Sequence, residues 1–327
     1  MSNESVGAVL VVYNPVKVDQ NKLRESVSKH APPSCRIEWV KTHPENEKAG
    51  EISVLSRPDI ALVLVAGGDG TVRLIASALA GTGISLGVIP VGTGNLLARN
   101  LGMDLGLDAS VKRAFKGVDR GIDVCRAKLT RPDGTVDCLG FTVMAGLGLD
   151  TGMLENTDER LKKRVGPLAY GQGILRSLAK GSDVSATYTI DGEEKTEATL
   201  NTMIFGNCGC LINDFPLLPE AKPDDGVFDV ITMAPRGPLG WLNVFGWIGI
   251  NAATAVVRKL PGTHWVKRSR KRNHLLLGGA SMLRYARGKR AAVEFSQPHI
   301  FELDGDPVGH VVSLVIEVEP KALLVRV

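Results

Sequence analysis

Two glycine-rich segments carry residue types that are suited to binding phosphate. Each follows a short apolar run that is typical of a buried strand, and the two segments are Gly67-Gly68-Asp69-Gly70-Thr71 and Gly92-Thr93-Gly94-Asn95. Glycine permits positive φ and leaves room for a ligand to lie against the backbone. The N–H groups of such a turn, with the amino end of a following helix, form an anion site. A single glycine turn can be only a tight connection, but two of them with a Thr in each favour phosphate binding.

Other signatures of nucleotide and hydrolase chemistry are missing. The sequence has no GxxxxGK[ST] motif and no GxGxxG after a strand, which disfavours P-loop enzymes and Rossmann dehydrogenases. It has no Gly-x-Ser-x-Gly elbow, so a serine hydrolase lacks support. Asp69 would repel bare phosphate from within the first turn, so it suits a role linked to magnesium. The pairs Asp225-Gly226 and Asp304-Gly305 can present carboxylates at a cleft, although Asp-Gly is also a common hairpin turn.

The elements that must position these residues differ between the two halves of the chain. In the first 120 residues, apolar runs at 7–13, 60–66 and 85–90 alternate with helical spacing at 21–30 and 71–80, which predicts a parallel sheet flanked by helices. After about Asp123, strand-like runs at 185–190, 200–206, 228–233, 292–296 and 311–318 are separated by turn pairs such as Asp191-Gly192. The predicted fold class is therefore an α/β amino-terminal domain with a parallel sheet and glycine phosphate loops, plus a mainly antiparallel, β-sandwich-like carboxy-terminal domain. We place the domains at 1–125 and 126–310, with 311–327 able to pack back on the first.

Composition and cysteine content describe an ordinary globular protein. Of 327 residues, 44% are hydrophobic and 23% charged, which argues against a disordered or fibrous chain. Five cysteines without CxxC spacing argue against a disulfide scaffold or a zinc finger and fit a reducing cytosol. The first residues lack the basic and apolar blocks of a signal peptide. These features predict a cytoplasmic protein.

The net charge of +4 hides a strong asymmetry. Residues 230–293 contain 12 Lys and Arg and no Asp or Glu, so this stretch carries +12 and the remainder −8. We therefore expect a partner that carries phosphates. The anionic inner face of a membrane is favoured over nucleic acid, because aromatic residues are not interleaved with the basic ones. The densest cluster consists of Lys267, Arg268, Arg270, Lys271 and Arg272.

The segment just before that cluster, Leu239–Val257, is uncharged over 19 residues. As a helix it would place Trp241, Phe245 and Ile248 on one stripe. Two Asn, a Thr and three Gly make a membrane span doubtful. A packed core helix and an interfacial helix beside the basic cluster both remain open.

The two glycine segments with their flanks resemble the diacylglycerol kinase catalytic family, which includes bacterial soluble lipid kinases and the sphingosine and ceramide kinases. The first motif is shared with NAD kinases and phosphofructokinases, and the second, with Asn95, narrows the match to lipid kinases. The resemblance covers nearly the whole chain in order, because further matches lie at Gly121–Asp123, Phe141–Asp150, Lys222–Asp229 and Asp304–Asp306.

The resemblance implies a role for particular residues. Gly67–Thr71 and Thr93–Asn95 would hold the phosphates of ATP, with Asn14, Pro15 and Thr42 at the edge of the nucleotide. Asp225 would bind magnesium with the main chain around Lys222 and Val227. Asp306 would be the general base toward a lipid hydroxyl, and Asp69 and Asp123 would belong to the surrounding carboxylate and water network. Phosphoryl transfer needs this set of parts, because it requires positioned substrates, a metal that offsets charge and a proton acceptor.

Two positions depart from the family pattern. The base is commonly Glu, and Asp306 is one methylene shorter. In the family, the loop that begins with Asn-Pro usually ends in glycine. In this chain Asn14-Pro15 is followed by Val16-Lys17-Val18, and Lys17 is able to supply positive charge there.

The function we expect is ATP-dependent phosphorylation of a lipid hydroxyl by a peripheral membrane enzyme. Diacylglycerol, giving phosphatidic acid, is the first candidate substrate and a sphingoid base the second. An NAD kinase is the next alternative, but those enzymes carry an Asn-Glu or Asn-Asp pair downstream of the first motif, and every Asn between Thr71 and Leu200 is followed by Leu or Thr. A non-catalytic module that binds membrane or nucleic acid is the alternative of another class. The sequence leaves the lipid and the oligomeric state open, a homodimer included.

Overall fold

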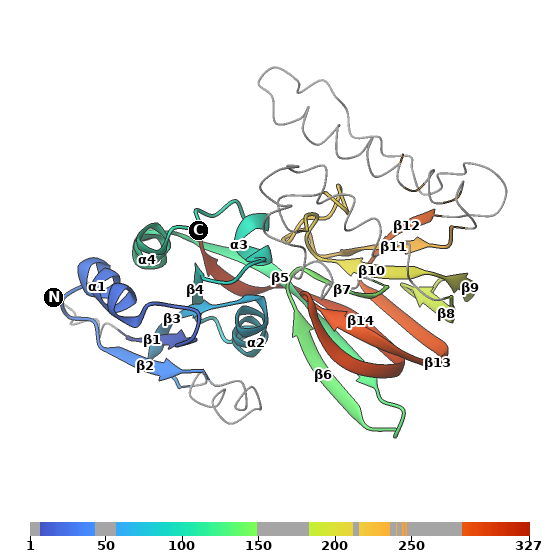
Figure 1. The fold of residues 1–327 in the computed structure, drawn as a ribbon, viewed down its shortest axis with the longest axis horizontal. Coiled ribbons are helices and arrows are strands. Elements are labelled where there is room, and N and C mark those ends of the chain that lie inside the picture. Colours follow the sequence, from blue (N-terminus) through green and yellow to red (C-terminus); the bar gives the residue numbers. More distant parts are fainter. Residues whose placement is uncertain are drawn as a thin grey trace, which may run out of the picture.

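The computed structural model describes residues 7–42, 57–148, 183–211, 216–235 and 283–327, with the single positions 240, 244 and 246. In these residues an α/β domain and an antiparallel β domain lie side by side (Figure 1), which confirms the predicted fold class. The basic cluster at 267–272 and nearly all of the segment at 239–257 lie outside the described residues. None of the described helices is long and apolar enough to cross a membrane.

Four parallel strands form the sheet of the α/β domain. They are β1 (Ala8–Tyr13), β2 (Ile37–Lys41), β3 (Ile60–Gly67) and β4 (Ser85–Pro90), in the order β2-β1-β3-β4. β1, β3 and β4 are buried almost throughout, as parallel strands covered by helices on both faces should be. β2, which the sequence prediction did not include, is the half-buried edge strand.

Alternate side chains of these strands pack on opposite faces of the sheet. Val9 and Val11 pack in one core with α1 (Gln20–His30) and α4 (Leu107–Lys116). Leu10 and Val12 pack in another core with α2 (Asp69–Leu79). The period of two along each strand therefore places the helices on both faces. α2 begins at Asp69, two residues before the predicted start, so Asp69 and Gly70 lie in its first turn rather than in a loop.

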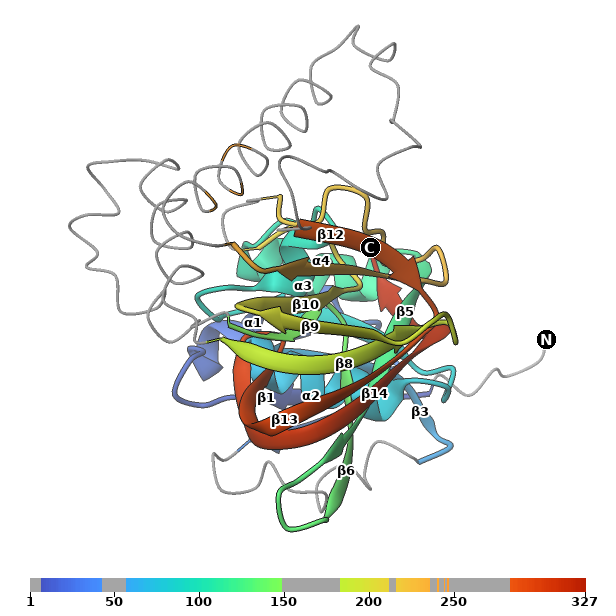
Figure 2. The same cartoon turned by 90° about the vertical axis from the view of Figure 1, so that its right-hand side faces the viewer.

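The second domain is built from antiparallel strands (Figure 2) around a core that includes Phe141, Phe205, Phe228 and Phe301. The predicted strand at 200–206 is two strands, β9 (Thr196–Leu200) and β10 (Thr202–Gly206), that meet at Asn201. The strands are β5 (Asp119–Thr130), β6 (Val136–Phe141), β7 (Met144–Leu147), β8 (Val184–Ile190), β9 (Thr196–Leu200), β10 (Thr202–Gly206), β11 (Phe228–Met233), β12 (Leu283–Gly288), β13 (Arg290–Leu303) and β14 (Asp306–Arg326).

β5 and β14 run through both domains (Figure 1). They pair with each other over most of their length, and the end of β14 also pairs in parallel with the start of β4. The boundary expected between residues 125 and 126 therefore falls inside β5. The pairing of β14 with β5 shifts register between Glu319 and Leu323, where Lys321 has a φ of 50°.

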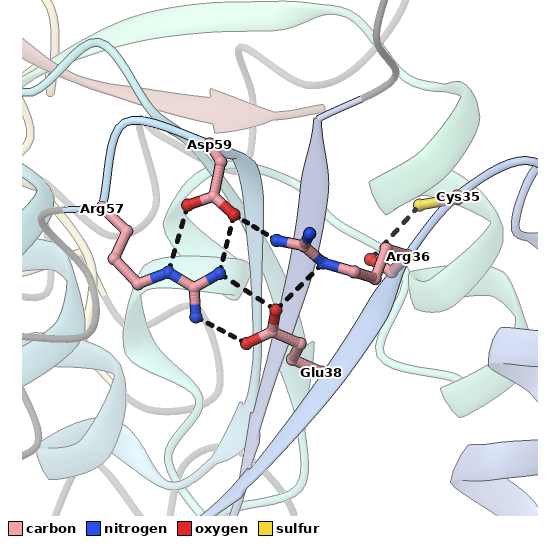
Figure 3. Close-up of polar contacts among 5 residues, drawn as sticks. All are labelled: Cys35, Arg36, Glu38, Arg57 and Asp59. Carbon is pink, nitrogen blue, oxygen red and sulfur yellow. Dashed lines mark hydrogen bonds and ion pairs between the residues drawn. The ribbon is translucent and has the colours of Figure 1, made fainter.

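A charge cluster closes the amino edge of the parallel sheet (Figure 3). Arg57 donates to Glu38 Oε2 and to Asp59 Oδ2, both at 2.7 Å, and Arg36 pairs with the same two acids. The guanidinium of Arg57 lowers the pKa of both carboxyls. The charges of two arginines and two acids balance here, and their ion pairs link the start of β2 to the chain before β3. The cluster lies at the amino ends of the parallel strands, whereas the glycine turns lie at the carboxyl ends. We therefore assign it a structural role.

Candidate phosphate-binding and catalytic site

The two glycine turns touch each other. They follow β3 and β4, which are neighbouring parallel strands, so both turns lie at the carboxyl edge of the sheet, where ligands of α/β folds bind. A Cβ added to Gly92 would lie 2.8 Å from the Cα of Gly68, and a Cβ added to Gly67 would lie 2.7 Å from the Cβ of Thr71. Gly92 is therefore required by close approach of the backbone and Gly67 by close approach of the Thr71 side chain, and Thr93 is exposed on the second turn.

Asp69 joins the second turn to the first. Its Oδ2 accepts the N–H of Asn95 at 2.9 Å, and its Oδ1 accepts the N–H of Leu96 at 2.6 Å. These bonds cap α3 (Leu96–Asn100) and hold the turn at Gly94, where a Cβ would lie 2.6 Å from Asp69 Oδ2. Burial raises the pKa of Asp69 to about 6, although the two N–H donors oppose the rise.

Two asparagines expected near the nucleotide use their side chains to shape its loops. Asn95 has a φ of 49°, and its amide exchanges hydrogen bonds with the backbone N–H and C=O of Gly92 at 2.9 and 2.8 Å. Asn14 Oδ1 accepts the N–H of Val16 at 2.9 Å. Thr42 Oγ1 donates to the carbonyl of Tyr13 at 3.4 Å, and Pro15 is exposed in the chain that follows β1. Contacts of these residues with a ligand would have to come from other atoms.

Lys17 brings a positive charge to the first turn. A Cβ added to Gly68 would lie 2.7 Å from Lys17 Nζ, so the ammonium lies directly over this glycine. Gly68 is also the N-cap of α2, whose amino end attracts anions. The lysine at which the chain departs from the family pattern thus stands where phosphate is expected.

Asp306 comes from the β domain and lies against the first turn of α2. A Cβ added to Gly70 would overlap Asp306 Oδ2 and lie 3.2 Å from Asp306 Cγ. Arg73 Nη2, from the next turn of the helix, is 3.5 Å from the same Oδ2. The side chain of Asp306 is 45% exposed, so its carboxylate is open to a substrate. The structure therefore brings Asp306, Asp69 and both glycine turns together.

Asp304 and Arg73 are residues of this site that sequence reasoning missed. Asp304, whose Asp-Gly pair the sequence leaves open as a carboxylate at a cleft or a hairpin turn, is buried and accepts the N–H groups of Thr142, Val143 and Met144 at 2.9 Å. Burial raises its pKa despite these donors. It fixes the chain between β6 and β7 and so anchors the turn that carries Asp306. Its partners lie about 160 residues earlier in the sequence, so no local pattern could have revealed the role.

Asp225, the acid expected to bind magnesium, lies in a second cluster of charged residues around the turn before β11. Asp225 forms an ion pair with Arg287, and Arg287 Nε is also 3.3 Å from the buried Asp229. Lys222 is exposed and Val227 half-buried. Asp123 Oδ2 accepts the N–H of the turn residue Gly226 at 2.7 Å.

The chemistry of this second cluster does not fit a magnesium ion at Asp225 while Arg287 remains in place. Magnesium binds carboxylate oxygens, and here the guanidinium of Arg287 contacts Oδ2 of Asp225, so its positive charge opposes a second cation at that carboxylate. In the part of the chain that the structure describes, no group of three or more His, Cys, Asp or Glu could hold a metal ion.

Comparisons with known proteins agree with this architecture. Residues 8–127 match the family model of the diacylglycerol kinase catalytic domain, and residues 143–246 match the YegS C-terminal NAD kinase beta sandwich-like domain. A diacylglycerol kinase of Mycobacterium tuberculosis (strain CDC 1551 / Oshkosh) is 32% identical over 173 residues, which are 53% of this chain and 54% of that protein. A Klebsiella pneumoniae (strain 342) protein named "Probable lipid kinase YegS-like" is 30% identical over 172 residues, 52% of this chain and 55% of that protein.

The chain spans about half the length of the curated relatives it matches. A solved structure of a diacylglycerol kinase from Bacillus anthracis str. Sterne shares the fold, with a TM-score of 0.63 at 20% identity over 98% of this chain and 96% of that one. Two consecutive family models match residues 8–127 and 143–246, one in each domain, and the motifs lie in the expected order. The chain belongs to the diacylglycerol kinase catalytic-domain family.

Proposed function

We propose that the chain is an ATP-dependent lipid kinase that phosphorylates the hydroxyl of a membrane lipid. Diacylglycerol, which gives phosphatidic acid, is the first substrate to test and a sphingoid base the second. One observation carries the proposal: the carboxylate of Asp306, from the β domain, lies against Gly70 at the edge of the two touching glycine turns. An acid beside a phosphate site is the arrangement that phosphoryl transfer to a hydroxyl needs.

The residues of the chain divide the work as follows. The turns at Gly67–Thr71 and Thr93–Asn95 receive the ATP phosphates, and Lys17 with the amino end of α2 offsets their charge. The hydroxyl oxygen of the lipid bonds to the γ-phosphorus of ATP, and Asp306 accepts the proton that this hydroxyl loses. The bond between the γ-phosphorus and the β,γ-bridging oxygen breaks, and ADP leaves. Magnesium, which accompanies ATP, stabilises charge on the phosphates.

A magnesium ion at Asp225, with the main chain of Lys222 and Val227, is the part of the family pattern that this chain supports least. The ion pair between Asp225 and Arg287 competes with it. The proposal therefore does not depend on a metal at that position.

Peripheral docking on an anionic membrane is a further part of the proposal. It rests on the sequence alone, because the cluster of Lys267, Arg268, Arg270, Lys271 and Arg272 lies outside the described residues. A lipid substrate stays in the bilayer, so the enzyme has to reach the surface. Electrostatic docking weakens as salt screens the charges.

The test incubates the protein with labelled ATP, Mg²⁺ and phosphatidylcholine–phosphatidylglycerol vesicles that contain either diacylglycerol or sphingosine, at low and high salt. We expect labelled phosphatidic acid, with less product at high salt. Asp306→Asn should abolish turnover and leave vesicle binding intact. Phosphorylation of NAD with no labelled lipid would overturn the proposal, and an absence of any turnover with intact vesicle binding would favour a pure binding module.

A further inference from the structure

A buried arginine, Arg73, lies beside Asp306 and has an unused donor. It is 7% exposed, on the second turn of α2. Its Nη2 is 3.5 Å from Asp306 Oδ2. Its Nε is buried and has no hydrogen-bond partner among the described residues. A guanidinium stays charged at every physiological pH and is costly to bury unless it meets an acid.

Arg73 also acts on the other acids of the site. Its charge stabilises the ionised form of the buried Asp304, and the charges of Asp304 and Asp306 both act on Asp69. Three carboxylates thus surround the turns that receive phosphates, which are themselves anionic. A cation is needed there if an ionised base is to stand next to ATP, because like charges at short range repel strongly.

The length of the base gives a second reason for an outside support. Asp306 has one methylene fewer than the Glu common at this position of the family, so it has fewer rotatable bonds with which to reach a substrate. Gly70 lets the carboxylate approach the helix, and Arg73 contacts the same oxygen from the next turn. The oxygen that faces the helix is therefore held between Gly70 and a fixed cation.

We propose that Arg73 is a positioning residue for Asp306, which holds the carboxylate against Gly70 and offsets its charge beside the ATP phosphates. This role rests on the proposed lipid kinase function. Because its guanidinium contacts Asp306, loss of Arg73 should lower the turnover rate by far more than it weakens the affinity for ATP.

The experiment compares Arg73→Met and Arg73→Lys with a matched control. Arg126→Met removes another partly buried arginine that contacts α2, through Ser77 near the end of the helix. The substrate is diacylglycerol in phosphatidylcholine–phosphatidylglycerol vesicles. We expect Arg73→Met to lower kcat by about 100-fold and to change KM for ATP by less than about threefold. Guanidinium added to Arg73→Met should restore part of the lost kcat, and Arg73→Lys should keep part of it. The kcat of Arg126→Met should stay near that of wild type.

Several outcomes would overturn the role of Arg73. An equal loss in Arg73→Met and Arg126→Met would mean that the arginine only stabilises the helix. A raised KM for ATP with unchanged kcat would mean that the guanidinium binds the nucleotide. If Arg73→Met does not fold, Arg73→Gln replaces it in the same measurements. Wild-type protein that labels no lipid would instead overturn the proposed function itself, and with it this role.

Discussion

Replacing Gly70 with alanine tests whether the place of Asp306 sets the rate of transfer. The new Cβ would overlap Asp306 Oδ2 and lie 3.2 Å from Asp306 Cγ. Non-bonded carbon and oxygen atoms approach to no less than about 3.3 Å, so the carboxylate has to move by roughly 1 Å. A displacement of that size at a reacting group can cost about 100-fold in rate. We therefore expect kcat of Gly70→Ala to fall by about two orders of magnitude.

The same substitution should leave the fold nearly as stable as before. The clash falls on the end of a side chain that is 45% exposed and can turn toward solvent. Alanine is also favoured over glycine within a helix by up to about 1 kcal/mol, and Gly70 lies in the first turn of α2. The assay is steady-state phosphate transfer from ATP to diacylglycerol, with urea unfolding measured in parallel. A stable Gly70→Ala protein with wild-type kcat would refute the reasoning, because Asp306 would then work without its present contact.

Three further substitutions test charges in and near the site. Lys17→Met should raise KM for ATP by about tenfold, because the ammonium of Lys17 lies over Gly68. The control Lys22→Met, on the exposed side of α1, should leave KM for ATP unchanged. An unchanged KM in both variants would show that Lys17 is not part of the phosphate site. Burial raises the pKa of Asp69 to about 6, so its protonation stabilises the fold at low pH and that gain is lost as the pH rises through about 6. Between about pH 7 and pH 5, the free energy of unfolding of wild type should thus rise by about 1 kcal/mol more than that of Asp69→Asn, and equal urea midpoint shifts would contradict this. Arg287→Gln should free the carboxylate of Asp225 to bind Mg²⁺. Added Mg²⁺ should then raise the Tm of the variant, measured by calorimetry, by a few degrees and leave the Tm of wild type unchanged. An equal rise in wild type would mean that Arg287 does not block the ion.

The features that follow from local backbone geometry could be predicted from the sequence. The strands before both glycine turns end where the apolar runs end, and β4 spans the predicted range 85–90. β2 escaped prediction because an edge strand is only half-buried and lacks a continuous apolar run. The start of α2 was placed late, since Asp69 and Gly70 are weak helix formers that tertiary contacts hold in the first turn.

The partners of the acids could not be predicted, because each lies far along the chain. Asp304 accepts from Thr142 through Met144, Arg287 reaches Asp225 across 62 residues, and Arg73 meets Asp306 across a domain boundary. A turn pair such as Asp304-Gly305 looks the same whether its carboxylate is solvated or buried. Only the pairing of distant strands decides between a solvated hairpin and an anchor of the site.

One strand fixes where the acid stands relative to the glycine turns. β14 begins at Asp306 and ends beside β4, the strand that leads into the turn at Gly92. Midway, its register shift against β5 is held by Asp123, whose Oδ1 accepts the N–H of Lys321 at 2.7 Å. Rotation of one domain against the other would break the backbone pairing at one end of β14 and leave polar groups without partners. Strand pairing therefore fixes the position of Asp306 relative to the glycine turns, which is what the proposed role of a short aspartate as the base requires.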